Sequence, residues 1–162
     1  MDKEEKISIL LFKNLIFTIL LPGVVAIVLP YRIGIKDKVL PVQFWNFFQY
    51  GGLLLVFVGS VMLLSCIVNF AFKGKGTLSP AFPAKKLVTT GLYCYSRNPM
   101  YIGVMLVLAG EMLFVLSLSL LIYSIIVFAC FHTFIILHEE PRLRRVFGAE
   151  YENYTKKVRR WI

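Results

Sequence analysis

The longest apolar run of the chain, Met100 to Leu137, limits the fold most strongly. It holds 38 residues, and only Glu111 within it is charged. As one straight helix rising about 1.5 Å per residue, it would measure about 57 Å, nearly twice the roughly 30 Å of a bilayer's hydrocarbon core. The run must therefore fold back on itself, and we expect the turn at Ser117-Leu118-Ser119. The sequence thus predicts a helical hairpin that crosses a membrane twice.

Two further apolar runs precede this hairpin. Ile7 to Leu29 contains only Lys13 as a charged residue, and Phe44 to Phe72 contains none. Each is longer than the roughly 20 residues that a spanning helix needs. The first run lacks the small-residue cleavage pattern of a signal peptide, so we interpret it as a span with a kink at Pro22-Gly23. The prediction is an all-α, multi-pass transmembrane bundle of four spans, forming one membrane domain over residues 1–162.

The composition supports this class and excludes several others. Hydrophobic residues make up 58% of the chain and charged residues only 17%, against about 25% charged in soluble domains. Disordered chains, fibrous repeats and disulfide-stapled secreted scaffolds do not have this composition. The net charge of +9 could indicate nucleic-acid binding, but the basic residues lie in the gaps between apolar runs. We therefore expect no nucleic-acid partner, and interpret the charge as a signal of membrane topology.

The distribution of basic residues predicts which way the chain faces. Of the 18 Lys and Arg residues, all but Arg32, Lys36 and Lys38 fall before the first turn, in the loop after the second span or in the tail. These three regions share one side of a four-span bundle. Because cytosolic loops carry the excess of Lys and Arg, both termini are predicted to be cytosolic, in a plasma or inner membrane.

Two segments on that side carry most of the polar chemistry. The first, residues 85–103, reads KKLVTTGLYCYSRNPMYIG. Gly91 permits a tight turn, and Asn98-Pro99 suits the start of a helix. Its tyrosines are also typical of an interfacial aromatic belt, so a purely structural loop is the alternative interpretation.

The second segment, residues 132–162, reads HTFIILHEEPRLRRVFGAEYENYTKKVRRWI. We expect the last span to end at Glu139-Glu140 and Pro141 to open a new helix. His132, Ile136 and Glu139 share one helix face by their spacing. Ionisable groups in a span suggest function, although His132 could bond a neighbouring helix and the glutamates could pair with the arginines that follow. Beyond Gly148, apolar residues recur every three or four positions, which predicts an amphipathic helix or helix pair on the membrane surface.

Other site classes find no support in the sequence. The three cysteines form no CxxC pair, and His132 and His138 are six residues apart, so we expect no metal site. No glycine-rich nucleotide-binding turn is present. Glu111 remains as either a hydrogen-bond partner in packing or the liner of a polar cavity.

Together the two polar segments resemble a known family. Arg-Asn-Pro-x-Tyr-x-Gly at 97–103, followed by Glu-Glu-Pro at 139–141 and Phe-Gly-x-x-Tyr-x-x-Tyr at 147–154, resembles the isoprenylcysteine carboxyl methyltransferase and phospholipid methyltransferase group of integral membrane enzymes. The likeness covers residues 85–162 and makes 73–162 a methyltransferase-like region behind two N-terminal spans at 1–72. It implies S-adenosylmethionine bound at the cytosolic end of the last two spans, under a lid made by the tail, and a lipophilic acceptor that enters from the bilayer.

The resemblance also implies site residues. Carboxylates suit the donor's sulfonium and ammonium groups, and tyrosine faces suit its adenine ring. The donor's carboxylate is expected to meet Arg97 or the backbone N–H groups at the helix start near Pro99. His132 and Glu139 are the candidate bases, and with Arg97 they form the predicted catalytic set. The cofactor contacts are expected at Lys85, Lys86, Leu87, Val88, Tyr93, Asn98, Pro99, Met100, Tyr101, Glu139 and Glu140.

One departure from the family leaves the acceptor open. Members that methylate a prenylcysteine carboxylate carry an arginine one turn before the glutamate pair, where this chain has Ile136. A prenylcysteine carboxylate needs no base, whereas a lipid amine or thiol must lose a proton. Two rival interpretations stay beside the methyltransferase: an NADPH enzyme resembling the sterol reductases, and a non-catalytic membrane protein or small transporter.

Overall fold

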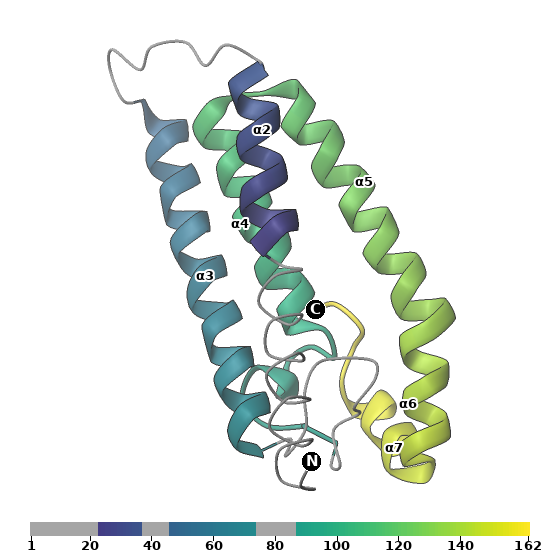
Figure 1. Cartoon of the computed structure of the whole chain (residues 1–162). Helices are drawn as coiled ribbons and strands as arrows, with labels where there is room; N and C mark the ends of the chain where they lie inside the picture. Colours follow the sequence, from purple (N-terminus) through teal and green to yellow (C-terminus); the bar gives the residue numbers. More distant parts are fainter. Residues whose placement is uncertain (1–22, 37–45, 74–86) are drawn as a thin grey trace, which may run out of the picture.

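The computed structural model describes residues 23–36, 46–73 and 87–162, and over these ranges the chain is helical and contains no strand (Figure 1). A short π-helix, η1, leads into α2, and α3 follows as the longest α-helix. A 3₁₀ turn, η2, precedes the hairpin of α4 and α5. A second π-helical segment, η3, joins α5 to the tail helices α6 and α7. The bounds are η1 Val24–Val28, α2 Leu29–Lys36, α3 Phe47–Lys73, η2 Gly91–Cys94, α4 Pro99–Val115, α5 Leu118–Phe134, η3 Ile135–Glu139, α6 Glu140–Phe147 and α7 Ala149–Lys157.

The predicted hairpin is confirmed, with its turn at Leu116-Ser117. Leu116 adopts a left-handed conformation (φ 53°), and its N–H donates to the Met112 carbonyl at 2.8 Å. The Ser117 hydroxyl then accepts the Leu120 N–H at 3.1 Å and caps α5. A left-handed non-glycine residue costs about 1–2 kcal/mol, and these two capping hydrogen bonds offset part of that cost. The chain therefore turns here without glycine or proline.

Helices α3 and α4 pack at unusually short range because glycines face each other. A Cβ added to Gly52 would lie 2.6 Å from the Gly110 carbonyl oxygen, and one added to Gly59 would lie 2.7 Å from the Gly103 oxygen. Small residues that let two backbones touch are typical of helix pairs in membranes, where apolar side chains gain little from burial. These contacts hold α3 and α4 side by side (Figure 1).

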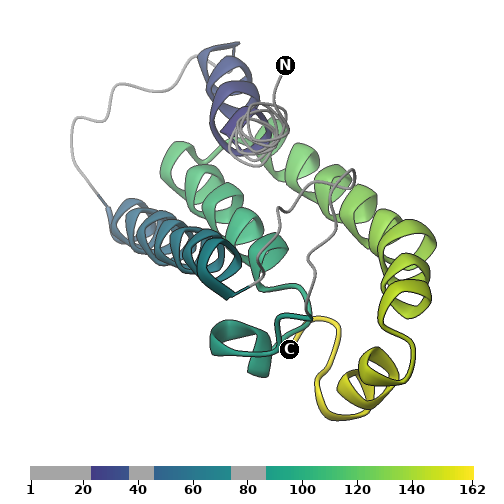
Figure 2. The ribbon, with the colours of Figure 1, turned by 60° about the horizontal axis from the view of Figure 1, so that its bottom comes forward.

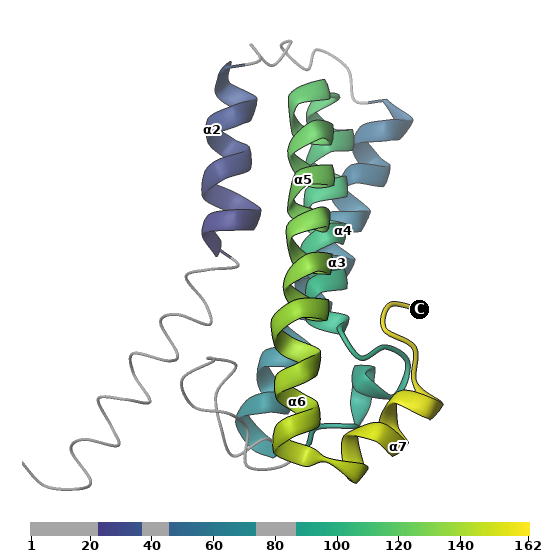
Figure 3. The ribbon, with the colours of Figure 1, turned by 90° about the vertical axis from the view of Figure 1, so that its right-hand side faces the viewer.

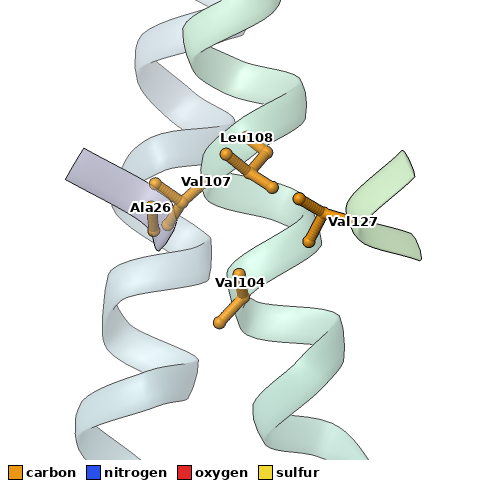
Figure 4. Packing of buried hydrophobic residues seen from close by; sticks show 5 residues of the cluster. All are labelled: Ala26, Val104, Val107, Leu108 and Val127. Carbon is orange, nitrogen blue, oxygen red and sulfur yellow. The ribbon is translucent and has the colours of Figure 1, made fainter. Parts of the chain in front are cut away.

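A second set of contacts joins α4 to its other neighbours. Figure 4 shows the buried residues of this cluster, which come from η1, α4 and α5. Nearby, the Tyr123 hydroxyl donates to the Val25 carbonyl at 2.9 Å and fixes η1 against α5. Helix α4 is therefore the centre of the bundle. The buried cluster consists of Ala26, Val104, Val107, Leu108 and Val127.

Among the described residues, two helices are long and apolar enough to cross a membrane, Phe47–Asn69 and Leu118–Phe147. Only 17% of each apolar window is buried inside the molecule, so most of their apolar side chains face outward. Apolar faces of this extent require a lipid environment or a partner. The second predicted span is thus found as α3. The first predicted span and the kink at Pro22 lie largely or wholly outside the described residues, so the count of four spans and the cytosolic termini stay predictions.

The predicted helix start at Pro141 is found, since α6 begins at Glu140 with Pro141 in its first turn, but no loop separates α6 from α5. The helix continues without a break from Leu118 to Phe147, and the π-helical turn η3 lies immediately before Pro141. Proline has no N–H to donate, and its ring collides with the carbonyl four residues earlier in a regular α-helix. The wider π turn removes that collision, so Glu139 and Glu140 lie within a continuous helix. Such π-helical insertions are frequent at functional sites.

The chain changes direction at Gly148 instead. Its φ of +50° and ψ of −124° suit only glycine, and α7 then runs back toward the start of α4 (Figure 3). The helix predicted beyond Gly148 is found as α7, and α6 precedes that glycine. Beyond α7 the chain becomes extended at Val158 and continues to the C-terminus.

Candidate active site

The C-terminal strap, Val158–Ile162, lies against the segment that precedes α4. The Arg97 N–H donates to the Arg159 carbonyl at 3.0 Å. The Arg160 carbonyl accepts from the Ser96 hydroxyl at 3.2 Å and from the Asn98 side-chain amide at 2.9 Å. These contacts bring the two polar segments together at one end of the bundle, where η2, the start of α4 and the C-terminus meet (Figure 2).

At this end Glu140 lies between two guanidinium groups. Arg97 Nη1 is 3.1 Å from Glu140 Oε1. Arg160 makes a bidentate contact, with Nε 2.7 Å from Oε1 and Nη2 3.0 Å from Oε2. These bonds raise the pKa of Arg160, so it stays charged. The cluster of three side chains therefore carries a net charge of about +1 and favours an anionic group more than a cationic one.

One buried donor of Arg97 has no hydrogen-bond partner. Its Nη1 also contacts the Tyr151 hydroxyl, at 3.3 Å. Its Nε is buried and has no hydrogen-bond partner, and the whole Arg97 side chain is only 12% exposed. Because buried polar groups are nearly always paired, an unpaired guanidinium N–H marks a position where an acceptor group would complete the bonding.

The second glutamate has a different partner. The Tyr101 hydroxyl donates to Glu139 Oε2 at 2.8 Å, which joins the first turn of α4 to η3. The Tyr101 ring also packs edge-on against Phe131, with ring centroids 4.8 Å apart. Glu140 is therefore paired with cations, whereas the hydrogen bond of Glu139 comes from a neutral hydroxyl. The two adjacent carboxyl groups can have different roles.

Tyr93 and Val88 form a buried wall behind the site. Both are 7% exposed and pack with Cys66 of α3, with Leu92 and Met100 at their edge. The Tyr154 hydroxyl of α7 donates to the Tyr93 carbonyl at 2.6 Å. Burial raises the pKa of the Tyr93 hydroxyl well above its usual value, so this side chain stays neutral.

His132 contacts the strap and not the glutamates. The Trp161 indole N–H donates to His132 Nδ1 at 3.3 Å, and the two rings stack with centroids 6.1 Å apart. The Trp161 ring also packs against Phe128, at 5.2 Å. Since an indole nitrogen can only donate, Nδ1 must carry the lone pair, and a neutral His132 then holds its proton on Nε2. Among the described residues no hydrogen bond joins His132 to Glu139 or Glu140.

The structure thus groups many of the predicted site residues. Arg97, Asn98, Tyr101, Glu139 and Glu140 are linked through the contacts above, and Pro99 and Met100 form the first turn of α4 beside them. Leu87 is half-buried next to the wall of Val88 and Tyr93. Lys85 and Lys86 lie outside the described residues.

Four residues of this region were not predicted from the sequence: Ser96, Tyr151, Arg160 and Trp161. Tyr151 is 1% exposed and faces Arg97, but in the sequence it is one more apolar position of an amphipathic helix. Nothing local distinguishes Arg160 from the other tail cations. Its role depends on the extended conformation that begins at Val158, which turns the last residues away from the helical pattern.

Comparison with known protein families finds one that matches most of this chain. The model of the phospholipid methyltransferase family matches residues 47–150, from the start of α3 to the start of α7. This range includes the Arg97–Gly103 motif and both glutamates.

Curated relatives show the same kind of likeness. Two proteins named probable protein-S-isoprenylcysteine O-methyltransferase, from Oryza sativa subsp. indica and subsp. japonica, are each 30% identical over 118 residues, covering 72% of this chain and 61% of theirs. Protein-S-isoprenylcysteine O-methyltransferase of Schizosaccharomyces pombe is 40% identical over 73 residues, covering 44% of this chain and 30% of its own. The chain therefore spans less than two thirds of these relatives. No solved structure matches it significantly.

Proposed function

Because the chain belongs to the phospholipid methyltransferase family, we propose that it transfers a methyl group from S-adenosylmethionine to a lipophilic acceptor at the end of the bundle where α4 begins. One observation carries this proposal. The Arg97–Glu140 and Tyr101–Glu139 contacts join two motifs about forty residues apart into one polar site beside two apolar helices. The curated relatives, which are named as O-methyltransferases, support the same reaction class.

The residues of the site fit the donor's amino-acid end. Arg97 Nε offers an unpaired, buried N–H, and the charge of the Arg97–Glu140–Arg160 cluster favours an anion. We assign to this cluster the carboxylate of the donor. Helix α4 begins beside it, and the free N–H groups of its first turn add to the attraction. Glu140 and Arg160 act as positioning residues, since they fix the guanidinium of Arg97.

The walls of the site fit the rest of the donor. When bound, S-adenosylmethionine supplies a methyl group already activated by its sulfonium. Tyr93, Val88 and Met100 provide apolar and aromatic surface for a flat ring. Glu139 accepts a hydrogen bond from the neutral Tyr101 hydroxyl and, in contrast to Glu140, makes no ion pair among the described residues. Its carboxyl group is therefore the one that would face a cationic centre of the donor. Most of the acceleration would then come from holding the reactants in line in a dry site.

The need for a base depends on the acceptor. A prenylcysteine carboxylate attacks without losing a proton, whereas a lipid amine or thiol must give one up. Glu139 is placed to take this proton. His132 can take it at Nδ1 only if the Trp161 indole leaves, because that lone pair is already engaged. Ile136, at the position of the family's carboxylate-binding arginine, is half-buried in η3 and has no charge to bind a carboxylate. We therefore keep all three acceptors in the proposal: a prenylcysteine carboxylate, a lipid amine and a thiol.

We place this reaction at a plasma or inner membrane, with both termini and the site in the cytosol. The polar donor would reach the site from the cytosol. The acceptor would enter from the bilayer, along the outward apolar faces of α3 and α5.

The test is methyl transfer by the purified full chain. The protein in detergent is incubated with methyl-labelled S-adenosylmethionine and, separately, with a prenylcysteine, total membrane lipids and a long-chain thiol. We expect label in at least one lipophilic product. Arg97→Ala should lower the rate about 100-fold or more, as for the loss of one group that stabilises charge in other active sites.

Arg144→Ala is the matched control, since Arg144 makes an exposed ion pair with Glu152 at 3.3 Å. It should retain the full rate. Binding of NADPH in place of S-adenosylmethionine would indicate a reductase. No binding of either would indicate a non-catalytic membrane protein.

A further inference from the structure

Helix α7 places two buried tyrosines, one turn apart, against the segment that precedes α4. Tyr151 is 1% exposed and Tyr154 is 8% exposed. The Tyr154 hydroxyl donates to the Tyr93 carbonyl at 2.6 Å, which docks α7 on this segment. Gly148, with its φ of +50°, lets the chain turn back so that α7 reaches it. The side chain of Tyr151 is therefore held in a fixed place beside Arg97.

The Tyr151 hydroxyl shares one nitrogen of Arg97 with a carboxylate. Arg97 Nη1 donates to the Tyr151 hydroxyl oxygen at 3.3 Å and lies 3.1 Å from Glu140 Oε1. A guanidinium group is planar, and its N–H donors have fixed directions within that plane. The two partners of Nη1, one on α6 and one on α7, therefore fix the plane of the whole group.

The plane of the guanidinium sets the direction of its remaining buried donor. Arg97 Nε has no hydrogen-bond partner, and its N–H lies in the same plane as Nη1. With Glu140 as its only partner, Nη1 would act as a pivot, and the direction of the Nε–H bond would vary. Burial raises the pKa of the Tyr151 hydroxyl, so this second partner stays neutral and adds no charge to the site. Its contribution is orientation.

We propose that Tyr151 is a positioning residue through which the site selects a donor that carries a carboxylate. Its hydroxyl fixes the guanidinium of Arg97 with the Nε–H bond directed at the place of that carboxylate. Tyr151 acts through Arg97 and does not itself bind the donor. This inference rests on the proposed function, because it requires S-adenosylmethionine at this site. It makes recognition of the donor's amino-acid end depend on α7.

The test compares two ligands that differ only in the carboxylate. Tyr151→Phe removes the hydroxyl oxygen and keeps the buried ring. Binding of S-adenosylmethionine and of decarboxylated S-adenosylmethionine to the purified full chain in detergent is measured by isothermal titration. We expect Tyr151→Phe to bind S-adenosylmethionine about tenfold more weakly than the wild type, as for the loss of one hydrogen bond to a charged group. The decarboxylated compound should bind the variant and the wild type equally.

Two results would overturn the proposal. A purely structural role of the Tyr151 hydroxyl would weaken the binding of both compounds by the same factor. Unchanged binding of S-adenosylmethionine by Tyr151→Phe would show that the hydroxyl does not orient Arg97. A wild type that binds neither compound would instead contradict the proposed function itself.

Tyr154→Phe is the matched control, since it removes a hydroxyl from the same helix, but one that bonds the Tyr93 carbonyl. Any loss of binding in this variant should be the same for both compounds. A loss confined to S-adenosylmethionine in Tyr154→Phe as well would overturn the assignment to Tyr151.

A second test asks whether Tyr151 acts through Arg97. In the background of Arg97→Gln, Tyr151→Phe should cause no further loss of S-adenosylmethionine binding, because the group that it orients is already gone. A further loss as large as the one in the wild-type background would show that Tyr151 acts in another way, and would overturn the proposal.

Discussion

The two ends of α4 are held in different ways. Toward Glu111, α4 is joined to α3 by backbone contact at Gly52 and Gly110, within an apolar surface. At its beginning, polar groups join it to the tail, and the partners of Ser96 and Asn98 are 64 and 62 residues away in the sequence. Close packing of this kind is permanent, whereas charged and hydrogen-bonded contacts respond to ligands, pH and salt. We therefore interpret the contact between α3 and α4 as structural, and the polar beginning of α4 as the place of the chemistry.

The largest effect is expected at the polar end. Glu140→Gln leaves Arg97 and Arg160 facing each other without a carboxylate. Removing one partner of a buried ion pair costs about 3–5 kcal/mol, and we expect the lower part of this range because Arg160 is 32% exposed. Unfolding in detergent measures the change. Glu152→Gln, in the exposed pair with Arg144, should change stability by less than about 1 kcal/mol. Equal effects of the two variants would contradict a buried cluster.

The next largest effect on stability is expected at the glycine contact between α3 and α4. Gly52→Ala places a Cβ against the Gly110 carbonyl and should destabilise by about 1–3 kcal/mol. Its neighbour Gly51 has no atom within 4 Å of an added Cβ, so Gly51→Ala should stabilise by up to about 1 kcal/mol through helix propensity. Both changes are read from unfolding curves. Destabilisation by both variants to the same extent would show that α3 and α4 do not touch at Gly52.

A smaller effect on stability is expected in the C-terminal strap. Trp161→Phe keeps an aromatic ring beside Phe128 but removes the indole donor to His132 Nδ1. The loss of one hydrogen bond should lower stability by about 1 kcal/mol. The nitrogen-15 chemical shift of His132 Nδ1 should change, because its lone pair loses a partner. An unchanged shift would mean that the indole bond does not form.

The smallest effect on stability, but a direct reading of topology, is expected at the cysteines. Cys94 is exposed next to the polar end, whereas Cys66 is fully buried. Cys130 on α5 is also exposed and is replaced by serine in all proteins compared. A membrane-impermeant maleimide applied from the cytosolic side should then label Cys94 rapidly and leave Cys66 unlabelled, and Cys94→Ser should abolish the fast labelling. Labelling of Cys94 only from the opposite side would contradict the proposed orientation.

The sequence predicts the apolar half of this molecule well. The length of the run from Met100 to Leu137 requires a hairpin, and the turn lies at Leu116-Ser117, within one residue of the expected position. The start of α4 at Pro99 follows from the Asn98-Pro99 pair. These features depend on length and local preference, which a sequence displays directly.

The polar half is less predictable, because its contacts join distant residues. A π turn before Pro141 carries the helix through the glutamate pair, and no periodicity shows it. Arg160 reaches Glu140 only because the chain becomes extended after α7. Likewise, the spacing of His132 and Glu139 suggested a shared face, but Trp161 of the strap contacts His132 instead.

The most direct test of this account is a double-mutant cycle on the binding of S-adenosylmethionine, measured by isothermal titration of the full chain. Arg97→Gln and Glu140→Gln are made singly and together. If the Arg97–Glu140 pair acts as one unit that holds the donor, each single variant should weaken binding strongly, and the double variant should lose little more, which gives a coupling of about 1–3 kcal/mol. Additive losses, or unchanged affinity in all three variants, would contradict the account.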